Sequence, residues 1–196
     1  MITKPAITSE KIHDIIQNRW SPRAFDSSKP IADDTVLALL EAARWAPSCM
    51  NEQPWRFLVC NKAKHEEAWQ GLLSCLAEKN QQWAVNAPLL LLAVAMNNFN
   101  QNQKANRWAA YDTGAASLNI CLQATAMGLV THQMGGFDAD QSRQRFNLPA
   151  DCTPMSVIAV GYQAEAEQLN DEFKQRELAE RSRVELEERF YWSSWS

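Results

Sequence analysis

The longest uninterrupted apolar segment of this 196-residue chain runs from Ala87 to Met96. Its ten residues are about half of the ~20 that a membrane-spanning helix needs. From Leu89 onward every position is apolar, which is typical of a β-strand covered on both faces rather than of one that alternates between core and solvent. The chain must therefore fold in layers on both sides of this strand.

Helical and strand-like segments alternate along the sequence. Apolar residues at helical spacing predict helices that begin near Ser9 and near Asp33 or Asp34, and that cover residues 63–79, 111–127, 140–146 and much of 163–190. Apolar runs bounded by polar residues predict strands over Trp55–Cys60, Leu89–Met96 and Met155–Gly161, and a short strand or a loop over Thr131–Phe137. This alternation predicts a mixed α/β or α+β fold, in one domain with an extended tail.

Composition limits the function. The chain has 19 lysines plus arginines against 23 aspartates plus glutamates, and its formal net charge of −4 disfavours sequence-independent binding to nucleic acid. Its six glycines form neither a G-x-G-x-x-G turn nor the Gly-Lys pair of a Walker loop. Any bound phosphate would therefore have to be held by side chains rather than by a glycine-lined backbone.

The cysteines and histidines restrict the compartment and the chemistry. Five cysteines without a C-x-x-C pair predict free, buried thiols in a reducing cytoplasm, and the N-terminus lacks the apolar core of a secretory signal. Only three histidines are present, and Trp69 stands where an H-E-x-x-H motif would need its second histidine. We therefore expect a cytoplasmic protein without a metal site and without a membrane segment.

Two pairs of arginines, one near each end of the chain, are candidates for a phosphate site. Arg19, Ser21 and Arg23 alternate after the first predicted helix, and in an extended segment such side chains project to the same side. Two guanidinium groups with a hydroxyl suit a dianionic phosphate, whereas the alternative is a solvated basic helix end. Near the C-terminus, Arg181 and Arg183 could join a phosphate site or lie on a solvated charged helix.

Two further segments carry groups suited to a flat ligand. In Pro47–Trp55, the amides of Asn51 and Gln53 can read a planar heterocycle with donor and acceptor edges, although a plain turn-forming loop is the alternative. Pro54 is expected to hold Gln53 extended. The Gly135–Gly136 pair allows backbone N–H groups to approach a flat ligand closely, and a tight turn is the alternative.

The chain resembles the FMN-dependent nitroreductase family over residues 12–196, in four patterns that occur in order: R-x-S-x-R-x-F, P-S-x-x-N-x-Q-P-W, G-L-x-x-x-x-M-G-G-F and R-x-R-x-x-L-E-E. The resemblance implies an α+β fold with a central mixed β-sheet flanked by helices, in an intertwined homodimer. It implies a single FMN-binding domain over residues 1–196, whose tail, residues 184–196, extends onto the partner subunit. The helix over residues 111–127 would form the dimer core.

The resemblance also implies which residues bind the cofactor. They would be Arg19, Ser21 and Arg23 at the FMN phosphate and ribityl chain, with Arg181 and Arg183 completing the phosphate site; Ser48, Asn51 and Gln53 of the partner subunit at the isoalloxazine ring; and the backbone near Gln133, Met134, Gly135 and Gly136 at the reactive flavin edge. No catalytic side chain is implied, because the flavin performs the hydride chemistry. Trp20, Cys49 and Met50 depart from the residues frequent in the family, which bears on phosphate affinity and substrate preference.

The function that the resemblance implies is an FMN-dependent oxidoreductase that uses NADH or NADPH to reduce nitroaromatics, quinones or related acceptors by a ping-pong mechanism. Three alternatives stay open: an FMN enzyme of a related subfamily, such as a dehydrogenase, a dehalogenase or a flavin-destructive enzyme; a non-catalytic flavin-binding protein; and a structural domain without a cofactor. No reader of a 2′-phosphate can be located in the sequence, so it does not choose between NADH and NADPH.

Overall fold

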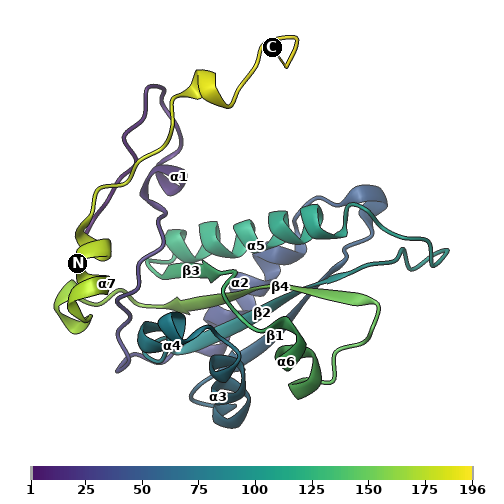
Figure 1. Cartoon of the computed structure of the whole chain (residues 1–196), viewed down its shortest axis with the longest axis horizontal. Helices are drawn as coiled ribbons and strands as arrows, with labels where there is room; N and C mark the ends of the chain where they lie inside the picture. The colour runs from purple at the N-terminus through teal and green to yellow at the C-terminus, as the bar shows by residue number, and fades with distance from the viewer. Residues whose placement is uncertain (1, 196) are drawn as a thin grey trace.

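The computed structural model describes residues 2–195 and has an antiparallel β-sheet at its centre (Figure 1). The strands lie in the order β1-β2-β4-β3, with β1 (Trp55–Asn61), β2 (Leu89–Met96), β3 (Val130–Met134) and β4 (Cys152–Gly161). The α+β class is confirmed. The expectation of a mixed sheet is not met within this chain, because each strand runs opposite to its neighbours in the sheet.

Helices cover both faces of the sheet. One face carries α2 (Asp33–Arg44) and α5 (Ala109–Ala126), and the other carries α3 (Glu66–Ser74), α4 (Glu78–Ala84) and α6 (Ala139–Arg145) (Figure 1). The side chains of β2 divide between two cores: Leu90 and Leu92 pack with α3 and α4, while Leu89 and Leu91 pack with α2 and α5. All four leucines are fully buried, and each such burial contributes ~1.5–3 kcal/mol. The two-sided cover expected for this strand is therefore confirmed.

The helix expected over residues 63–79 is broken into α3 and α4. At the break, Leu76 forms a β-bridge with Phe137, and the N–H of Asp138 donates to the carbonyl oxygen of Cys75 at 2.7 Å. A segment more than 60 residues further along the chain therefore takes up the hydrogen bonds that would have continued the helix. The spacing of apolar residues within 63–79 does not indicate that a distant segment pairs with the chain at this point.

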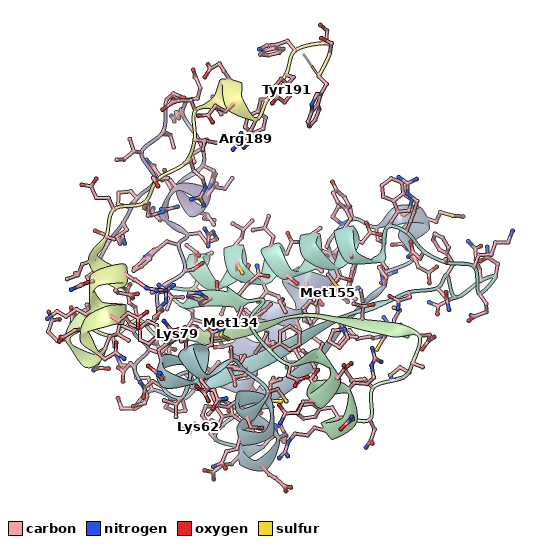
Figure 2. All side chains as sticks on the ribbon, viewed as in Figure 1. Lys62, Lys79, Met134, Met155, Arg189 and Tyr191 are labelled. Carbon is pink, nitrogen blue, oxygen red and sulfur yellow. The ribbon has the colours of Figure 1, made fainter. Side chains whose placement is uncertain are left out.

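The two ends of the chain lie side by side in an arm, residues 2–20 and 179–195, that projects from the layered body (Figure 1). Arg181 ties the two segments together, because its guanidinium donates to three backbone carbonyl oxygens of residues 2–20. Figure 2 shows Arg189 and Tyr191 on the outer part of the arm, away from the sheet and its helices. None of the helices between residues 2 and 195 is long and apolar enough to cross a membrane.

Both segments of the arm are less helical than expected. Helix α1 (Asp14–Asn18) begins after His13, whose ring accepts a hydrogen bond from the backbone, and not after Ser9. Within residues 163–190, α7 (Asp171–Leu178) is followed by extended chain and a single 3₁₀ turn. The reason is the pairing inside the arm, which uses backbone carbonyl groups that a longer helix would need for itself.

Candidate functional site

A cavity of about 330 Å³ lies where the arm joins the body, and positive charge dominates its lining. We call it the cationic cavity. Its wall brings together the first and the last sequence motifs, and includes Arg19, Ser21, Arg23, Arg181 and Arg183. Lys4 and Arg176 add two cations, and Glu180 is an acidic residue on the same wall. Arg19, Ser21 and Arg23 all line this cavity, but the intervening Trp20 lines it as well, so a strict alternation of sides is not observed.

The arginines of the cationic cavity repel one another. Burial lowers the pKa of Arg181, and the charges of Arg19 and Arg183 lower it further. Burial also lowers the pKa of Arg23, where Glu177 acts in the opposite direction. A bound dianion would relieve this repulsion and accept charge-assisted hydrogen bonds from several donors at once. The donor set, guanidinium groups with a serine hydroxyl, therefore fits a phosphate.

Arg181 has a structural role that the sequence does not predict. Its Nη1 donates to the carbonyl oxygens of Lys4 at 2.5 Å and of Gln17 at 2.9 Å, and its Nη2 donates to that of Arg19 at 3.1 Å. Most of its donors are thus taken by backbone, so Arg181 gives the cavity its charge more than its hydrogen bonds. Arg183 is exposed on the same wall, with more of its guanidinium open to a ligand.

Two side chains outside the predicted motifs hold the backbone of the first motif. The Nδ1–H group of His132, on β3, donates to the carbonyl oxygen of Pro22 at 3.0 Å. The carboxylate of Glu177, on α7, accepts the N–H of Arg23 at 3.0 and 2.9 Å and the N–H of Ala24 at 3.2 Å. Burial raises the pKa of Glu177, while these hydrogen bonds oppose the rise. Burial, followed by the charge of Arg23, lowers the pKa of His132 to about 4, so the ring is neutral at pH 7.

The second motif forms a strained connector, residues 48–53, between α2 and β1. Met50, Asn51 and Gln53 have positive φ angles of 55°, 54° and 52°, in a region that side chains other than glycine rarely adopt. The prediction that Pro54 holds Gln53 in an extended conformation is wrong, because the φ of Gln53 is 52°. The N–H of Gln53 donates instead to Oγ of Ser48 at 3.0 Å and closes the connector on itself. Strain of this kind persists where surrounding contacts impose it, and it clusters at binding sites.

The connector lies at the start of α5, away from the cationic cavity (Figure 1). The N–H of Cys49 donates at 3.0 Å to the carboxylate of Asp112, which is buried in the first turn of α5. Glu52 in turn accepts the N–H of Asn100 at 2.8 Å, from the loop before α5. The 18 residues of α5 span ~27 Å, and β3 and α7 lie toward the other end of the helix. Within one chain, the polar groups of the connector therefore do not meet the arginines.

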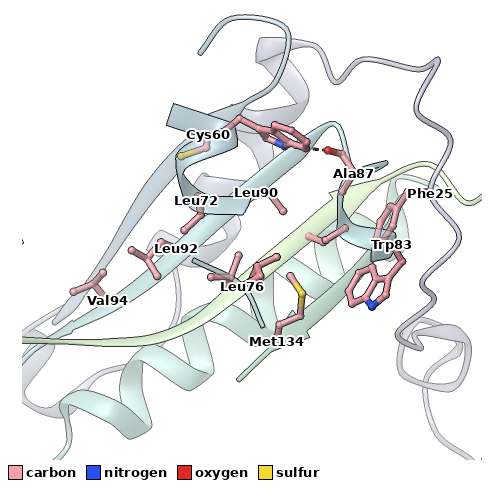
Figure 3. Packing of buried hydrophobic residues seen from close by; sticks show 14 of the residues in the cluster. Phe25, Cys60, Leu72, Leu76, Trp83, Ala87, Leu90, Leu92, Val94 and Met134 are labelled. Carbon is pink, nitrogen blue, oxygen red and sulfur yellow. Dashed lines mark hydrogen bonds between the residues drawn. The ribbon is translucent and has the colours of Figure 1, made fainter. Parts of the chain in front are cut away.

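Two residues predicted beside a flavin edge lie at the end of β3. The side chain of Met134 is buried in the core with Leu76 and Leu92, so only its backbone is available to a ligand (Figure 3). Gln133 is exposed, and its Nε2 donates to Sγ of Cys121 on α5 at 3.4 Å. Of the two side chains, only that of Gln133 can reach a ligand.

Gly135 and Gly136 follow directly after the end of β3. The carbonyl oxygen of Gly136 accepts the N–H of Ala77 at 2.9 Å and Nδ2 of Asn80 at 3.0 Å, which fixes the turn against the start of α4. Both Gly135 and Gly136 are exposed and line an open cavity of about 600 Å³. This cavity shares no lining residue with the cationic cavity. The structure thus brings the first and last motifs together and leaves the other two apart from them.

Other kinds of chemistry have less support in the structure. Among residues 2–195, no group of three or more histidine, cysteine, aspartate or glutamate side chains is placed to hold a metal ion. All five cysteines are free thiols, and four of them are buried. Burial raises the pKa of Cys60 to about 11, so this thiol is protonated and unreactive at neutral pH. The half-buried thiol is Cys49, in the connector.

The family model for the nitroreductase family matches residues 16–162, which are 147 of the 196 residues. The chain belongs to the nitroreductase family. A crystal structure of an oxidoreductase containing FMN is 30% identical to it, with a TM-score of 0.91 over 97% of this chain and 96% of that chain. The family membership that the four sequence motifs predict is therefore confirmed.

Two more distant relatives extend the comparison. A protein of Exiguobacterium sibiricum 255-15, solved in complex with FMN, has the same fold at 21% identity, with a TM-score of 0.75 over 97% of this chain and all of that one. YdgI of Bacillus subtilis (strain 168), whose name provisionally assigns it an NAD(P)H nitroreductase activity, is 26% identical over 195 residues. That alignment covers 81% of this chain and 91% of YdgI.

Proposed function

We propose that the protein is an FMN-dependent oxidoreductase that takes electrons from NADH or NADPH and passes them to a nitroaromatic, a quinone or a related small aromatic acceptor. The observation that carries the proposal is the cationic cavity, where two arginine motifs from opposite ends of the chain converge. The 30% identical structure contains FMN, and YdgI is provisionally named for NAD(P)H nitroreductase activity, which supports this cofactor and this donor. Bound FMN would supply the hydride chemistry, so the chain needs no acid, base or nucleophile of its own.

The residues divide into a phosphate site, a ring site and a flavin edge. Arg19, Ser21, Arg23 and Arg183 would bind the phosphate and the ribityl chain, and Arg181 would add charge. The ring would be contacted by Ser48, Asn51 and Gln53 of the partner subunit, because the connector of the same chain lies at the far end of α5. The side chain of Gln133 and the backbone of Met134, Gly135 and Gly136 would lie at the flavin edge. These groups orient the cofactor and exclude water from it.

The outer face of α5 supports a homodimer. Tyr111 and Leu118 are 76% and 47% exposed on this face, and Gly114 and Ala115 between them are small enough to let a second helix approach closely. The opposite face of α5 carries the buried residues Ala116, Ile120 and Ala124, so apolar residues lie on both sides of the helix, which is typical of a helix that is covered on both sides. Trp192 in the arm is 95% exposed, which supports a tail that extends onto the partner.

Kinetics and spectroscopy test the proposal. Donor and acceptor would use the same face of the flavin in turn, so double-reciprocal plots should be parallel, and intersecting lines would contradict a ping-pong mechanism. Anaerobic mixing with NADH or with NADPH should bleach the visible flavin absorbance. If neither donor bleaches tightly bound FMN, a non-catalytic flavin-binding protein or an enzyme of a related subfamily becomes the better interpretation. A protein that stays colourless after FMN is added would contradict every function that depends on bound FMN, and would favour a structural domain without a cofactor.

An Arg23→Ala variant is expected to bind FMN more weakly by about 1.5–3 kcal/mol, or ~10- to 150-fold in Kd, because a charged hydrogen bond to the phosphate is lost. The measurement is the quenching of FMN fluorescence on titration with apoprotein. Lys64→Ala is the matched control, since Lys64 is an exposed cation paired with Asp33, away from the cationic cavity. Unchanged FMN affinity in Arg23→Ala would remove this residue from the site.

An Asn51→Ala variant is expected to lower kcat/KM by about tenfold, the scale of one lost hydrogen bond to the ring, while the protein stays dimeric. Asn147→Ala is the matched control for backbone strain, because Asn147 has a similar φ of 50° on an exposed loop. Steady-state kinetics and light scattering measure the two properties. A monomeric Asn51→Ala protein would point to a structural role in the dimer instead.

A further inference from the structure

One peptide group beside the cationic cavity is held at both of its polar ends. Its carbonyl oxygen, that of Pro22, accepts a hydrogen bond from Nδ1 of His132 at 3.0 Å. Its N–H, that of Arg23, donates to both carboxylate oxygens of Glu177 at 3.0 and 2.9 Å. The two side chains come from β3 and α7, more than 100 residues away along the chain. We call this arrangement the peptide clamp.

The carboxylate of the peptide clamp is costly to bury. Glu177 has no exposed surface, and the pKa of its side chain is raised by this burial. A buried ionised carboxylate destabilises a fold unless hydrogen bonds and opposite charges compensate it. Three backbone N–H contacts supply that compensation, and all of them come from Arg23 and Ala24. The carboxylate is therefore directed at the segment that carries Arg23 to the phosphate site.

The clamp restricts the direction of the Arg23 side chain. Pro22 has a fixed φ, and the peptide group that follows cannot rotate while His132 and Glu177 hold its two ends. The backbone N–H of Arg23 meets Glu177, while its guanidinium lines the cationic cavity. Lys4 binds the carbonyl oxygen of Glu177 at 2.8 Å, so the end of α7 that carries the carboxylate is itself fixed to the arm.

We propose that Glu177 is a positioning residue of the phosphate site, which acts through the backbone of Arg23 to aim its guanidinium at the bound phosphate. His132 holds the other end of the same peptide. This inference rests on the proposed FMN binding. A positioning role and a purely electrostatic role predict opposite changes in FMN affinity, because a negative charge near the cationic cavity repels a phosphate. Removal of the charge would then strengthen FMN binding, whereas loss of positioning weakens it.

The experiment compares FMN with riboflavin, which lacks the phosphate, on apoprotein by fluorescence titration. In Glu177→Gln, an amide NH₂ replaces one of the two oxygens that accept the N–H of Arg23, so the clamp is weakened with little change in volume. We expect the Kd for FMN to rise about tenfold and the Kd for riboflavin to stay within about twofold of the wild-type value. Glu180→Gln is the matched control, because it removes an acidic group from the same cavity wall, and its FMN affinity should be equal or higher.

Any other pattern of FMN and riboflavin affinities would overturn the positioning role of Glu177. Equal weakening of FMN and riboflavin would give Glu177 a merely structural role, and tighter FMN binding would make its role electrostatic; both overturn the inference. If the wild type binds riboflavin and FMN equally, the phosphate site itself is wrong, and if it binds neither, the proposed function fails as well. Should Glu177→Gln not fold, His132→Phe releases the other end of the peptide and keeps an aromatic ring against Trp83, whose ring centroid lies 4.6 Å from that of His132 at an interplanar angle of 44°. The same selective loss of FMN affinity is expected from it.

Discussion

Leu118→Arg is expected to convert the proposed homodimer into a monomer. Leu118 lies in the middle of α5 on its exposed apolar face, with Gly114 and Ala115 one turn before it. If this face is the core of a twofold interface, each dimer would have to bury two unpaired guanidinium groups close together. The dimer dissociation constant should rise at least about a hundredfold, the scale of ~3 kcal/mol for a central interface residue. Size-exclusion chromatography with light scattering at micromolar protein measures it.

The same variant is expected to lose FMN. The connector that would contact the ring lies at the start of α5, and the cationic cavity lies toward its other end, so a monomer retains the phosphate site without the ring site. Val85→Arg is the control, since Val85 is a 39% exposed apolar residue just after α4, on the opposite face of the sheet. A Leu118→Arg protein that keeps the wild-type mass and its flavin would place the interface elsewhere.

Those parts of the fold that depend on continuous apolar pattern could be predicted from the sequence. The bounds of β2 are those expected, because a strand buried on both faces is apolar at every position. Helix α5 was expected over residues 111–127 and is observed over Ala109–Ala126, ended by Gly128 at a φ of +73°. In the first motif, Arg19, Ser21 and Arg23 line one cavity, although the intervening Trp20 lines it too and their alternation did not predict that.

Contacts between distant segments could not be predicted. Nothing in the sequence around His132 indicates its partner, because Pro22 is 110 positions away. Glu177 stands in a segment rich in charged residues, where nothing local distinguishes its buried carboxylate from the exposed carboxylates of Asp171 and Glu172. Asp112 in the first turn of α5 looks like a residue that complements the helix dipole, yet it also holds the connector. In each case the role of the side chain depends on a distant backbone group to which it is hydrogen-bonded, and the sequence does not show that contact.

Acid should destabilise the apoprotein through His132. The pKa of this ring is about 4 in the folded state, against an ordinary value of 6.5, because burial and the neighbouring Arg23 and Arg19 oppose its charge. The unfolded chain therefore binds a proton between pH 6.5 and 4 that the folded chain does not, and the free energy of unfolding falls as the pH falls through this window. The loss attributable to this group approaches about 3 kcal/mol by pH 4 and is absent above pH 7.

Comparison with His132→Phe isolates this contribution. Glu177 works in the opposite direction, because its raised pKa makes the folded state take up a proton more readily than the unfolded state, but it does so in both proteins. Urea unfolding at intervals from pH 7 to pH 4 should therefore show a steeper decline in stability for the wild type than for His132→Phe. His65→Phe is the matched control, since His65 is exposed, and it should keep the wild-type acid sensitivity. Parallel stability curves for the wild type and His132→Phe would mean that the imidazole of the peptide clamp accepts a proton without cost, and that the Pro22 carbonyl is held as well by the charged ring as by the neutral one.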